Sequence, residues 1–286
     1  MKTNNRFTLL AATALAFLNF QILAQQLKAP QASPTQTLKQ NFALGEIDID
    51  YSRPGAKGRT IYGDLVPFDK LWRTGANSCT KITFSDNVSI EGNAVAAGTY
   101  SLFTIPGKTE WTIILNKNTK QSGTDSYKQE EDLLRIKVKP VAMNDKLETF
   151  TINVMDITST TANIDLCWEK TRVDFSVTAN IDSTMMKNIE AALSPADKRP
   201  YFQAASYYYD NGKDLNKALE WVNKAVDQNP KAFFVVNLKA RIQLKLKDFK
   251  GAIASAEQSS ALAKEAKNED YVKLNDKLIE EAKKGK

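Results

Sequence analysis

The sequence contains no histidine among its 286 residues. This absence excludes the Ser-His-Asp and Cys-His catalytic arrangements, the HExxH zinc site and every histidine-based metal cage. Cysteine is also scarce, because only Cys79 and Cys167 occur, and they stand too far apart for a CxxC redox or zinc motif. We therefore expect neither a bound metal nor a cofactor.

Long apolar runs are rare as well, and the one that stands out is N-terminal. Lys2 and Arg6 precede an apolar run from Phe7 to Leu23, and the small residue Ala24 follows it. That layout is typical of a secretory signal peptide. The alternative is a transmembrane anchor, but the strongly apolar part is shorter than the roughly 20 residues that span a bilayer. We predict a signal peptide over residues 1–24, a periplasmic or secreted chain, and no membrane span after cleavage.

Neither sign of charge dominates, since 39 Lys and Arg face 33 Asp and Glu, for a formal net charge of +6. The basic excess lies in the C-terminal third, which raises the question of nucleic acid or an anionic surface as a partner. The charges there are interleaved in sign, which is typical of a solvated helix surface, and an exported protein meets little nucleic acid. We therefore predict no nucleic-acid partner.

The first half of the chain shows the pattern of a β domain. Residues 25–40 are polar with two prolines, so we expect a flexible leader there. From Ile47 to Tyr51 apolar residues alternate with acidic ones, which is the period of a strand with one buried face. Further short strands are expected at 79–85, 88–91, 99–105, 111–116, 133–139, 149–157, 163–169 and 172–179. The pattern predicts an antiparallel β-sandwich or barrel over residues 41–182.

The C-terminal part, residues 184–286, has a helical period, so the whole chain is predicted to be a multi-domain α+β protein. Ala218 and Ala252 stand 34 residues apart in similar phrases, NKALEWVNKA and KGAIASAEQS, and this spacing is the tetratricopeptide length. A last helix at about 269–284 would cap the repeats. A generic helical bundle is the alternative. Tetratricopeptide-like repeats would dock a protein or peptide partner.

The two cysteines could pair, because a disulfide is the usual fate of thiols in an oxidising compartment. Cys79 and Cys167 each stand on an expected strand at the parity opposite to that of the apolar neighbours. Both thiols are therefore expected on an outer face of the β domain. A disulfide also requires Cα atoms within about 7 Å, so pairing and free thiols both stay open.

The most unusual stretch is YSRPGAKGRTIYGDLVPFDKLWRTGAN, residues 51–77. It combines the side chains that we select as a candidate site: Arg53, Arg59, Trp72, Arg73 and Asn77. Its phrases SRPGAKGR and WRTGAN, with ITFSDNV, AAGTYSLFTIPG and LCWEKTRV further on, resemble an exported bacterial family, domain of unknown function 2911, over roughly residues 38–180. The resemblance implies an exported β domain, often beside tetratricopeptide-like repeats, and it implies no particular activity.

Two interpretations of this cluster stay open. In the first, the guanidinium groups bind a small anion or a sugar, and the indole of Trp72 supplies a flat wall. In the second, the arginines pair with nearby carboxylates, for which the sequence offers Asp48, Asp50, Asp64 and Asp69, and act as structural staples. We adopt the first as the prediction: Arg59, Arg73 and Asn77, backed by Arg53 and Trp72, line one pocket.

These features favour a binding or scaffold protein over an enzyme. The β domain would hold a small anionic or carbohydrate ligand, and the helical part would dock its partner. One alternative is a hydrolase of envelope glycans or peptides that uses paired carboxylates, for which Glu130, Glu131 and Asp132 are available. The other alternative is a purely structural assembly module.

Overall fold

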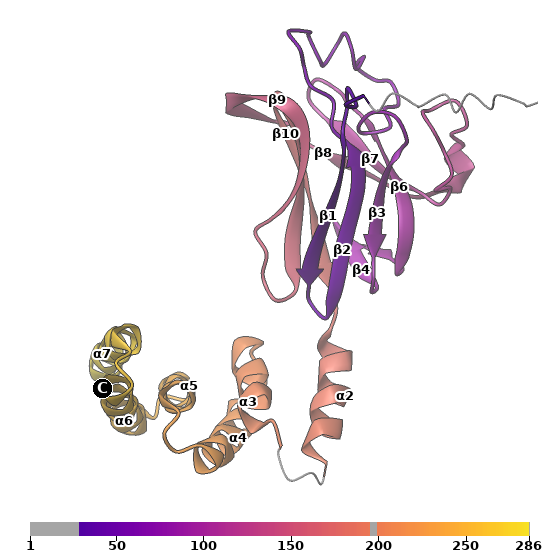
Figure 1. Ribbon diagram of the computed structural model, residues 1–286. Helices are drawn as coiled ribbons and strands as arrows, with labels where there is room; N and C mark the ends of the chain where they lie inside the picture. The colour runs from indigo at the N-terminus through magenta and orange to yellow at the C-terminus, as the bar shows by residue number, and fades with distance from the viewer. Residues whose placement is uncertain (1–28, 195–198, 286) are drawn as a thin grey trace, which may run out of the picture. The chain divides into compact units, whose positions relative to one another are not determined.

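The computed structural model describes residues 29–194 and 199–285. Within this range the chain divides into a β unit, which ends at Ala179, and a helical unit, which starts at Asn180 (Figure 1). The predicted fold class, an antiparallel β domain followed by an all-α region, is confirmed. The predicted signal peptide lies outside the described residues.

The strands of the β unit form two antiparallel sheets. The first has the order β1-β2-β3-β6-β7-β8, and the second has the order β5-β4-β10-β9. The strands are β1 (Thr35–Phe42), β2 (Gly45–Ser52), β3 (Thr80–Phe84), β4 (Val88–Ile90), β5 (Asn93–Val95), β6 (Gly98–Ile105), β7 (Trp111–Asn116), β8 (Asp132–Val138), β9 (Val141–Met155) and β10 (Thr161–Ala179).

The two sheets pack against each other through alternating apolar residues. In β2, the side chains of Ile47, Ile49 and Tyr51 are buried, as the period of the sequence predicts. The Tyr51 ring reaches the second sheet, where it packs edge-on against Phe150 of β9 with ring centroids 5.9 Å apart. The backbone N–H of Ile152 in β9 donates to the Tyr51 hydroxyl at 2.9 Å. The β unit is therefore a sandwich rather than a barrel.

The expected leader contains a strand, so the prediction of a flexible segment up to residue 40 is wrong from Thr35 onward. Strand β1 pairs with β2 along its whole length, from Thr35 opposite Ser52 to Phe42 opposite Gly45. Most of its residues are exposed or only half-buried, because it lies at the edge of its sheet. Its sequence therefore lacks the apolar alternation that identifies the inner strands, and backbone hydrogen bonds to β2 hold it in place.

The last two expected strands are one continuous strand, β10, with an irregularity in the middle. The register against β9 shifts on both sides of Glu169, whose φ of 53° lies in the left-handed region. Before it, Ile164 and Leu166 are buried, and after it, Val173 and Phe175 are buried. The bulge thus moves the buried face from even to odd positions, which is why the period of the sequence breaks there.

The helical unit contains six helices in its described residues. These are α2 (Asp182–Leu193), α3 (Tyr201–Asp210), α4 (Leu215–Gln228), α5 (Phe233–Lys245), α6 (Phe249–Glu265) and α7 (Glu269–Lys284). Helix α3 packs on α4, α5 packs on α6, and α6 packs on α7. In the described residues, no helix is both long and apolar enough to cross a bilayer.

The 34-residue spacing of the sequence recurs in the way α4 and α6 begin. Asp214 and Asp248 each cap the N-terminus of their helix, because their carboxylates accept backbone N–H groups of the first turn. Four residues later, Ala218 and Ala252 are both fully buried, so each allows close approach of the packed helices. The tetratricopeptide interpretation stays a prediction.

Candidate functional site

The connection between β2 and β3, residues 53–79, builds a cleft on the β unit. Backbone contacts anchor this connection to both sheets. Trp72 and Thr104 of β6 exchange two backbone hydrogen bonds, and the Ala56 N–H donates to the Glu148 carbonyl of β9. Between these anchors, Thr74 has a φ of 55°, which is uncommon for a β-branched residue. Its buried hydroxyl lies 3.1 Å from that of Thr104, and this contact helps to hold the strained backbone.

An aromatic cluster lies beneath the cleft. The indoles of Trp72 and Trp168 stack with centroids 6.0 Å apart at 18°. Tyr62 packs edge-on against both indoles and against Trp111 of β7, so the cluster joins the connection to both sheets. Each stacked indole N–H is satisfied at 3.1 Å, from Trp72 to the Gly75 carbonyl and from Trp168 to a backbone carbonyl of β9. The apolar faces of this cluster therefore form a rigid floor.

The cleft has a volume of about 360 Å³. Its lining combines three cationic side chains, Arg59, Lys70 and Arg73, with the indoles of Trp72 and Trp168. None of the described residues that line it carries a carboxylate. Its electrostatic character is therefore cationic, and the half-buried indole of Trp72 supplies a flat apolar surface.

Arg59 is held in place by neutral groups. Its Nε donates to the Ala56 carbonyl at 3.0 Å, and its Nη2 donates to the Gly55 carbonyl at 2.7 Å. Both bonds fix the direction of the guanidinium group, and neither supplies a negative charge. The charge of Arg59 is therefore available to a bound anion.

Arg73 and Lys70 have no ion-pair partner within residues 29–194 and 199–285. The Nε of Arg73 is buried without a hydrogen-bond acceptor. The guanidinium group lies beside Gly123, whose missing Cβ would stand 3.5 Å from Nη1. A buried donor without an acceptor costs about 1–3 kcal/mol, so hydrogen bonding of Nε does not explain the position of Arg73.

The other two predicted site residues lie elsewhere. The Arg53 side chain reaches β9. Its Nε donates to the Phe150 carbonyl at 3.1 Å, and its Nη2 donates to the Thr151 hydroxyl at 2.7 Å. The Asn77 amide donates to a backbone carbonyl and to a serine hydroxyl, both at 3.2 Å. Neither lines the cleft. The structure thus brings together Arg59, Trp72 and Arg73, while Arg53 and Asn77 connect the loop to the rest of the β unit.

The structural interpretation of the cluster requires ion pairs of Arg53, Arg59 or Arg73, and none is found among residues 29–194 and 199–285. In the described part of the chain, Asp48 pairs with Lys39 at 3.7 Å, and Asp50 accepts the hydroxyl of Thr37. Arg53 is a staple, but one that uses neutral acceptors of the second sheet.

Sequence reasoning missed Lys70, Trp168 and Thr124, which also line the cleft. Lys70 precedes Trp72 in the WRTGAN region and could have been included on that ground. Trp168 comes from β10, where its alternation with neighbouring apolar residues indicates only a core position. No local pattern in the sequence places it beside the connection.

The two cysteines do not form a disulfide. Both thiols are free and buried: Cys79 lies just before β3 of the first sheet, and Cys167 lies in β10 of the second. Cys79 precedes β3 and packs with Phe103 and Ile114, and its thiol donates to the Gly123 carbonyl at 3.0 Å. Burial raises the pKa of both thiols, that of Cys167 to about 11. The parity of the strand does not leave Cys79 exposed, because the loop that contains Gly123 covers its thiol.

The carboxylates considered for hydrolysis hold the same loop. Asp132 accepts the hydroxyl of Tyr127 at 2.6 Å, the amide of Asn116 at 2.9 Å and a guanidinium N–H of Arg135 at 2.8 Å. Burial and the hydrogen bond to Asp132 raise the pKa of Tyr127 to about 12. Glu131 accepts an amide N–H from the same loop. None of these groups lines the cleft.

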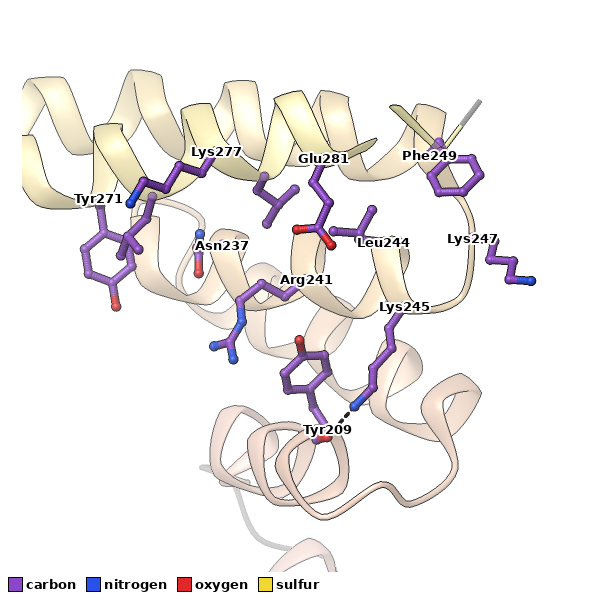
Figure 2. Close-up of a pocket in the computed structure, with 13 residues that line it drawn as sticks. Tyr209, Asn237, Arg241, Leu244, Lys245, Lys247, Phe249, Tyr271, Lys277 and Glu281 are labelled. Atoms are coloured by element: carbon purple, nitrogen blue, oxygen red, sulfur yellow. Dashed lines mark hydrogen bonds between the residues drawn. The ribbon is translucent and has the colours of Figure 1, made fainter. Parts of the chain in front are cut away.

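A second and larger cavity lies in the helical unit, between α3, α5 and α7 (Figure 2). This groove has a volume of about 920 Å³. Its lining contains the basic residues Arg241, Lys245, Lys247 and Lys277 and one acidic residue, Glu281. Apolar and aromatic side chains complete it.

The fold and the cleft define an antiparallel β-sandwich with a loop-built cationic cleft, followed by a helical unit. The family model described as "Protein of unknown function (DUF2911)" matches residues 33–177, which is half of the 286-residue chain. The chain therefore belongs to this family, as the phrases of residues 51–77 indicated. No curated protein and no solved structure matches the chain.

Proposed function

We propose that this chain is an exported binding protein whose β unit holds a small anionic ligand in the cleft of Arg59, Lys70 and Arg73. One observation carries the proposal: three cationic side chains line a cleft whose described lining has no carboxylate. Opposite charges attract, so a cleft with this lining favours an anion over a cation. An anion in the cleft would balance the positive charge of these side chains.

The size and walls of the cleft narrow the ligand further. A volume of about 360 Å³ suits a small molecule, since ligand sites commonly measure about 300–1,000 Å³. The half-buried indole of Trp72 favours a ring, either a sugar or an aromatic group. The best candidate is therefore a ring compound with a carboxylate, sulfate or phosphate group, which the guanidinium of Arg73 would bind.

Binding is favoured over carboxylate-based hydrolysis by the placement of the acidic groups. A glycosidase needs two carboxylates on either side of the scissile bond, about 5–10 Å apart. The candidates Glu131 and Asp132 each accept a hydrogen bond from the loop of residues 117–128, and neither lines the cleft.

The binding proposal is tested by titrating the full chain with charged and neutral probes of similar shape. We expect galacturonate and benzoate to bind and galactose and benzyl alcohol to bind much more weakly. Arg73→Gln and Lys70→Gln should each weaken binding by about tenfold, because a charged hydrogen bond contributes about 1.5–3 kcal/mol. The matched control is Lys139→Gln, which removes an exposed charge of the β unit outside the cleft. Equal binding of charged and neutral probes would contradict the proposal.

We further propose that the helical unit docks a protein or peptide partner, as tetratricopeptide-like repeats would. The groove between α3, α5 and α7 supports this role because it is open and more than twice as large as the cleft. A purely structural module would need neither cavity.

Export is part of the same proposal, supported by the signal-peptide pattern of residues 1–24. Intact-mass measurement of periplasmic or secreted material should give Gln25, or a close neighbour, as the first residue. Full-length chain recovered only from the cytoplasm would contradict export.

A further inference from the structure

The two walls of the groove in the helical unit are formed by different helices. Helix α5 contributes Asn237, Arg241 and Lys245, and α7 contributes Lys277 and Glu281. Figure 2 shows the Lys277 and Glu281 side chains extending from α7, with Arg241 and Lys245 on the α5 side. The groove is therefore lined by charged groups from helices that are not adjacent in the sequence.

The charges of the groove are predominantly positive and poorly compensated. Arg241 and Lys245 lie over the ring of Tyr209, at 4.6 and 4.7 Å from its centroid, which orients them without neutralising them. The only carboxylate near Arg241 among the described ion pairs is that of Asp210, at 3.9 Å, and both side chains are about half exposed. Such a pair is weak in water, so it leaves the cationic charge available.

The basic residues Lys247 and Lys277 of the groove are even less compensated by negative charge. Lys247 and Lys277 are exposed, and no ion pair of either is found within the described residues. Glu281 is the single acidic residue of the lining. Four cationic side chains against one anionic side chain make the groove complementary to a negatively charged partner.

Apolar surface accompanies these charges. Leu274 of α7 is 51% exposed although it is a large apolar residue, and it lines the groove beside Leu278 and Tyr271. Leu244 of α5 lines the same groove. A partner that buried this surface would gain roughly 25 cal/mol for each Å² removed from water. A free inorganic anion or a nucleic-acid backbone would leave it uncovered.

We infer that the groove binds an acidic peptide segment of a partner protein, one that carries at least two carboxylates and an apolar side chain. The carboxylates bind Arg241 and Lys277 from opposite walls, and the apolar side chain covers Leu274. This inference rests on the proposed docking role of the helical unit and adds the chemistry of the partner. Guanidinium and ammonium groups on both walls select carboxylates, while the exposed leucine selects against a segment that is only acidic.

The experiment selects peptides from a random dodecapeptide library, with the full chain as bait and the Arg241→Gln, Lys277→Gln double variant as counter-bait. We expect enriched sequences to contain Asp or Glu together with Leu, Ile or Phe. One enriched peptide is then synthesised, labelled and titrated by fluorescence anisotropy. Lys277→Gln should raise its Kd by about tenfold, in the range measured for close charge pairs at interfaces, and added NaCl should raise it further.

Two controls separate charge loss from unfolding. Lys264→Gln removes an exposed lysine of α6 outside the groove, and its Kd should equal that of the parent chain. Leu274→Ser keeps every charge and should weaken binding of the same peptide. All variants should retain the parent melting temperature, because Lys277, Lys264 and Leu274 have exposed side chains.

Three results would overturn the inference. Enrichment of neutral or basic peptides that still depend on Leu274 would leave the docking role intact and reject the acidic class. Binding of a single-stranded oligonucleotide as tight as that of the peptide would assign the charges to a nucleic-acid backbone. Failure of any peptide to be enriched over the double variant would reject both the inference and the docking role, while anion binding in the β unit is measured independently.

Discussion

Replacing Arg53 with alanine should destabilise the β unit, whereas the same change at Arg73 should leave stability nearly unchanged. Arg53 donates two hydrogen bonds to β9, to the Phe150 carbonyl at 3.1 Å and to the Thr151 hydroxyl at 2.7 Å, and so connects the two sheets. For Arg73, the part of the chain that the structure describes offers no acceptor to the buried Nε.

The magnitude follows from these contacts. A hydrogen bond from a charged donor contributes about 1.5–3 kcal/mol when buried, and Arg53 is only half-buried, so we expect a total loss of about 2 kcal/mol. For a unit of this size the melting temperature should fall by about 4–8 °C. Arg73→Ala should lower the free energy of unfolding by less than about 0.5 kcal/mol, because it removes a buried Nε donor that has no acceptor among the described residues.

Thermal unfolding followed by tryptophan fluorescence is the appropriate assay, because three of the four tryptophans, Trp72, Trp111 and Trp168, lie in the β unit. Equal destabilisation by Arg53→Ala and Arg73→Ala would refute the distinction between a staple and a ligand-binding arginine. A larger loss at Arg73 would mean that the cationic cleft is a structural feature of the folded domain.

Three further predictions concern titration, thiol reactivity and buried polar contacts. Hydrogen bonds from Lys213 and a tyrosine lower the pKa of Asp182 below its ordinary value of 3.8. The ionised carboxylate therefore stabilises the helical unit above pH 3.8, and this stabilisation is lost as the pH falls through the lowered pKa. Helical melting followed at 222 nm should therefore weaken below about pH 4, and Asp182→Asn should flatten this dependence. Cys79 and Cys167 should resist alkylation by iodoacetamide in the folded chain at pH 8, and both should react in guanidinium without reductant. A chain that is not alkylated in guanidinium, and whose mass is two hydrogens below that of the free-thiol form, would instead contain a disulfide. Asn275→Ala should lower the free energy of unfolding of the helical unit in urea by about 2–3 kcal/mol. The fully buried Asn275 side chain would lose its hydrogen bonds to α5 and α6 and leave their polar groups unsatisfied. A loss below about 0.5 kcal/mol, which is typical of a surface substitution, would contradict this prediction.

The regular parts of the fold could be predicted from the sequence because each element carries its own period. The alternation of Ile47, Ile49 and Tyr51 identifies β2, and the last helix has the predicted bounds, Glu269–Lys284. Strand β1 could not be found this way, because an edge strand is specified by its partner more than by burial. The bulge at Glu169 also hid the continuity of β10, since one extra residue reverses the side-chain parity.

The candidate site could be predicted only in part. The phrase around Arg73 marks the connection as unusual, and Arg59, Trp72 and Arg73 do meet in one cleft. The direction of a side chain within an irregular connection depends on contacts distant in sequence. The hydrogen bonds of Arg53 to β9 and the arrival of Trp168 from β10 are such contacts, so no local pattern reports them.

The stacked indoles beneath the cleft give the chain an optical property. Trp72 and Trp168 are nearly parallel at 18° with centroids 6.0 Å apart. Excited states of two aromatic rings this close couple, so the near-ultraviolet circular dichroism of the chain should contain a band that belongs to the pair. A ligand that enters beside Trp72 would alter the geometry or the environment of the pair and change that band. The cleft therefore carries its own label-free reporter of occupancy, and screening of candidate ligands needs no knowledge of the reaction or partner in advance.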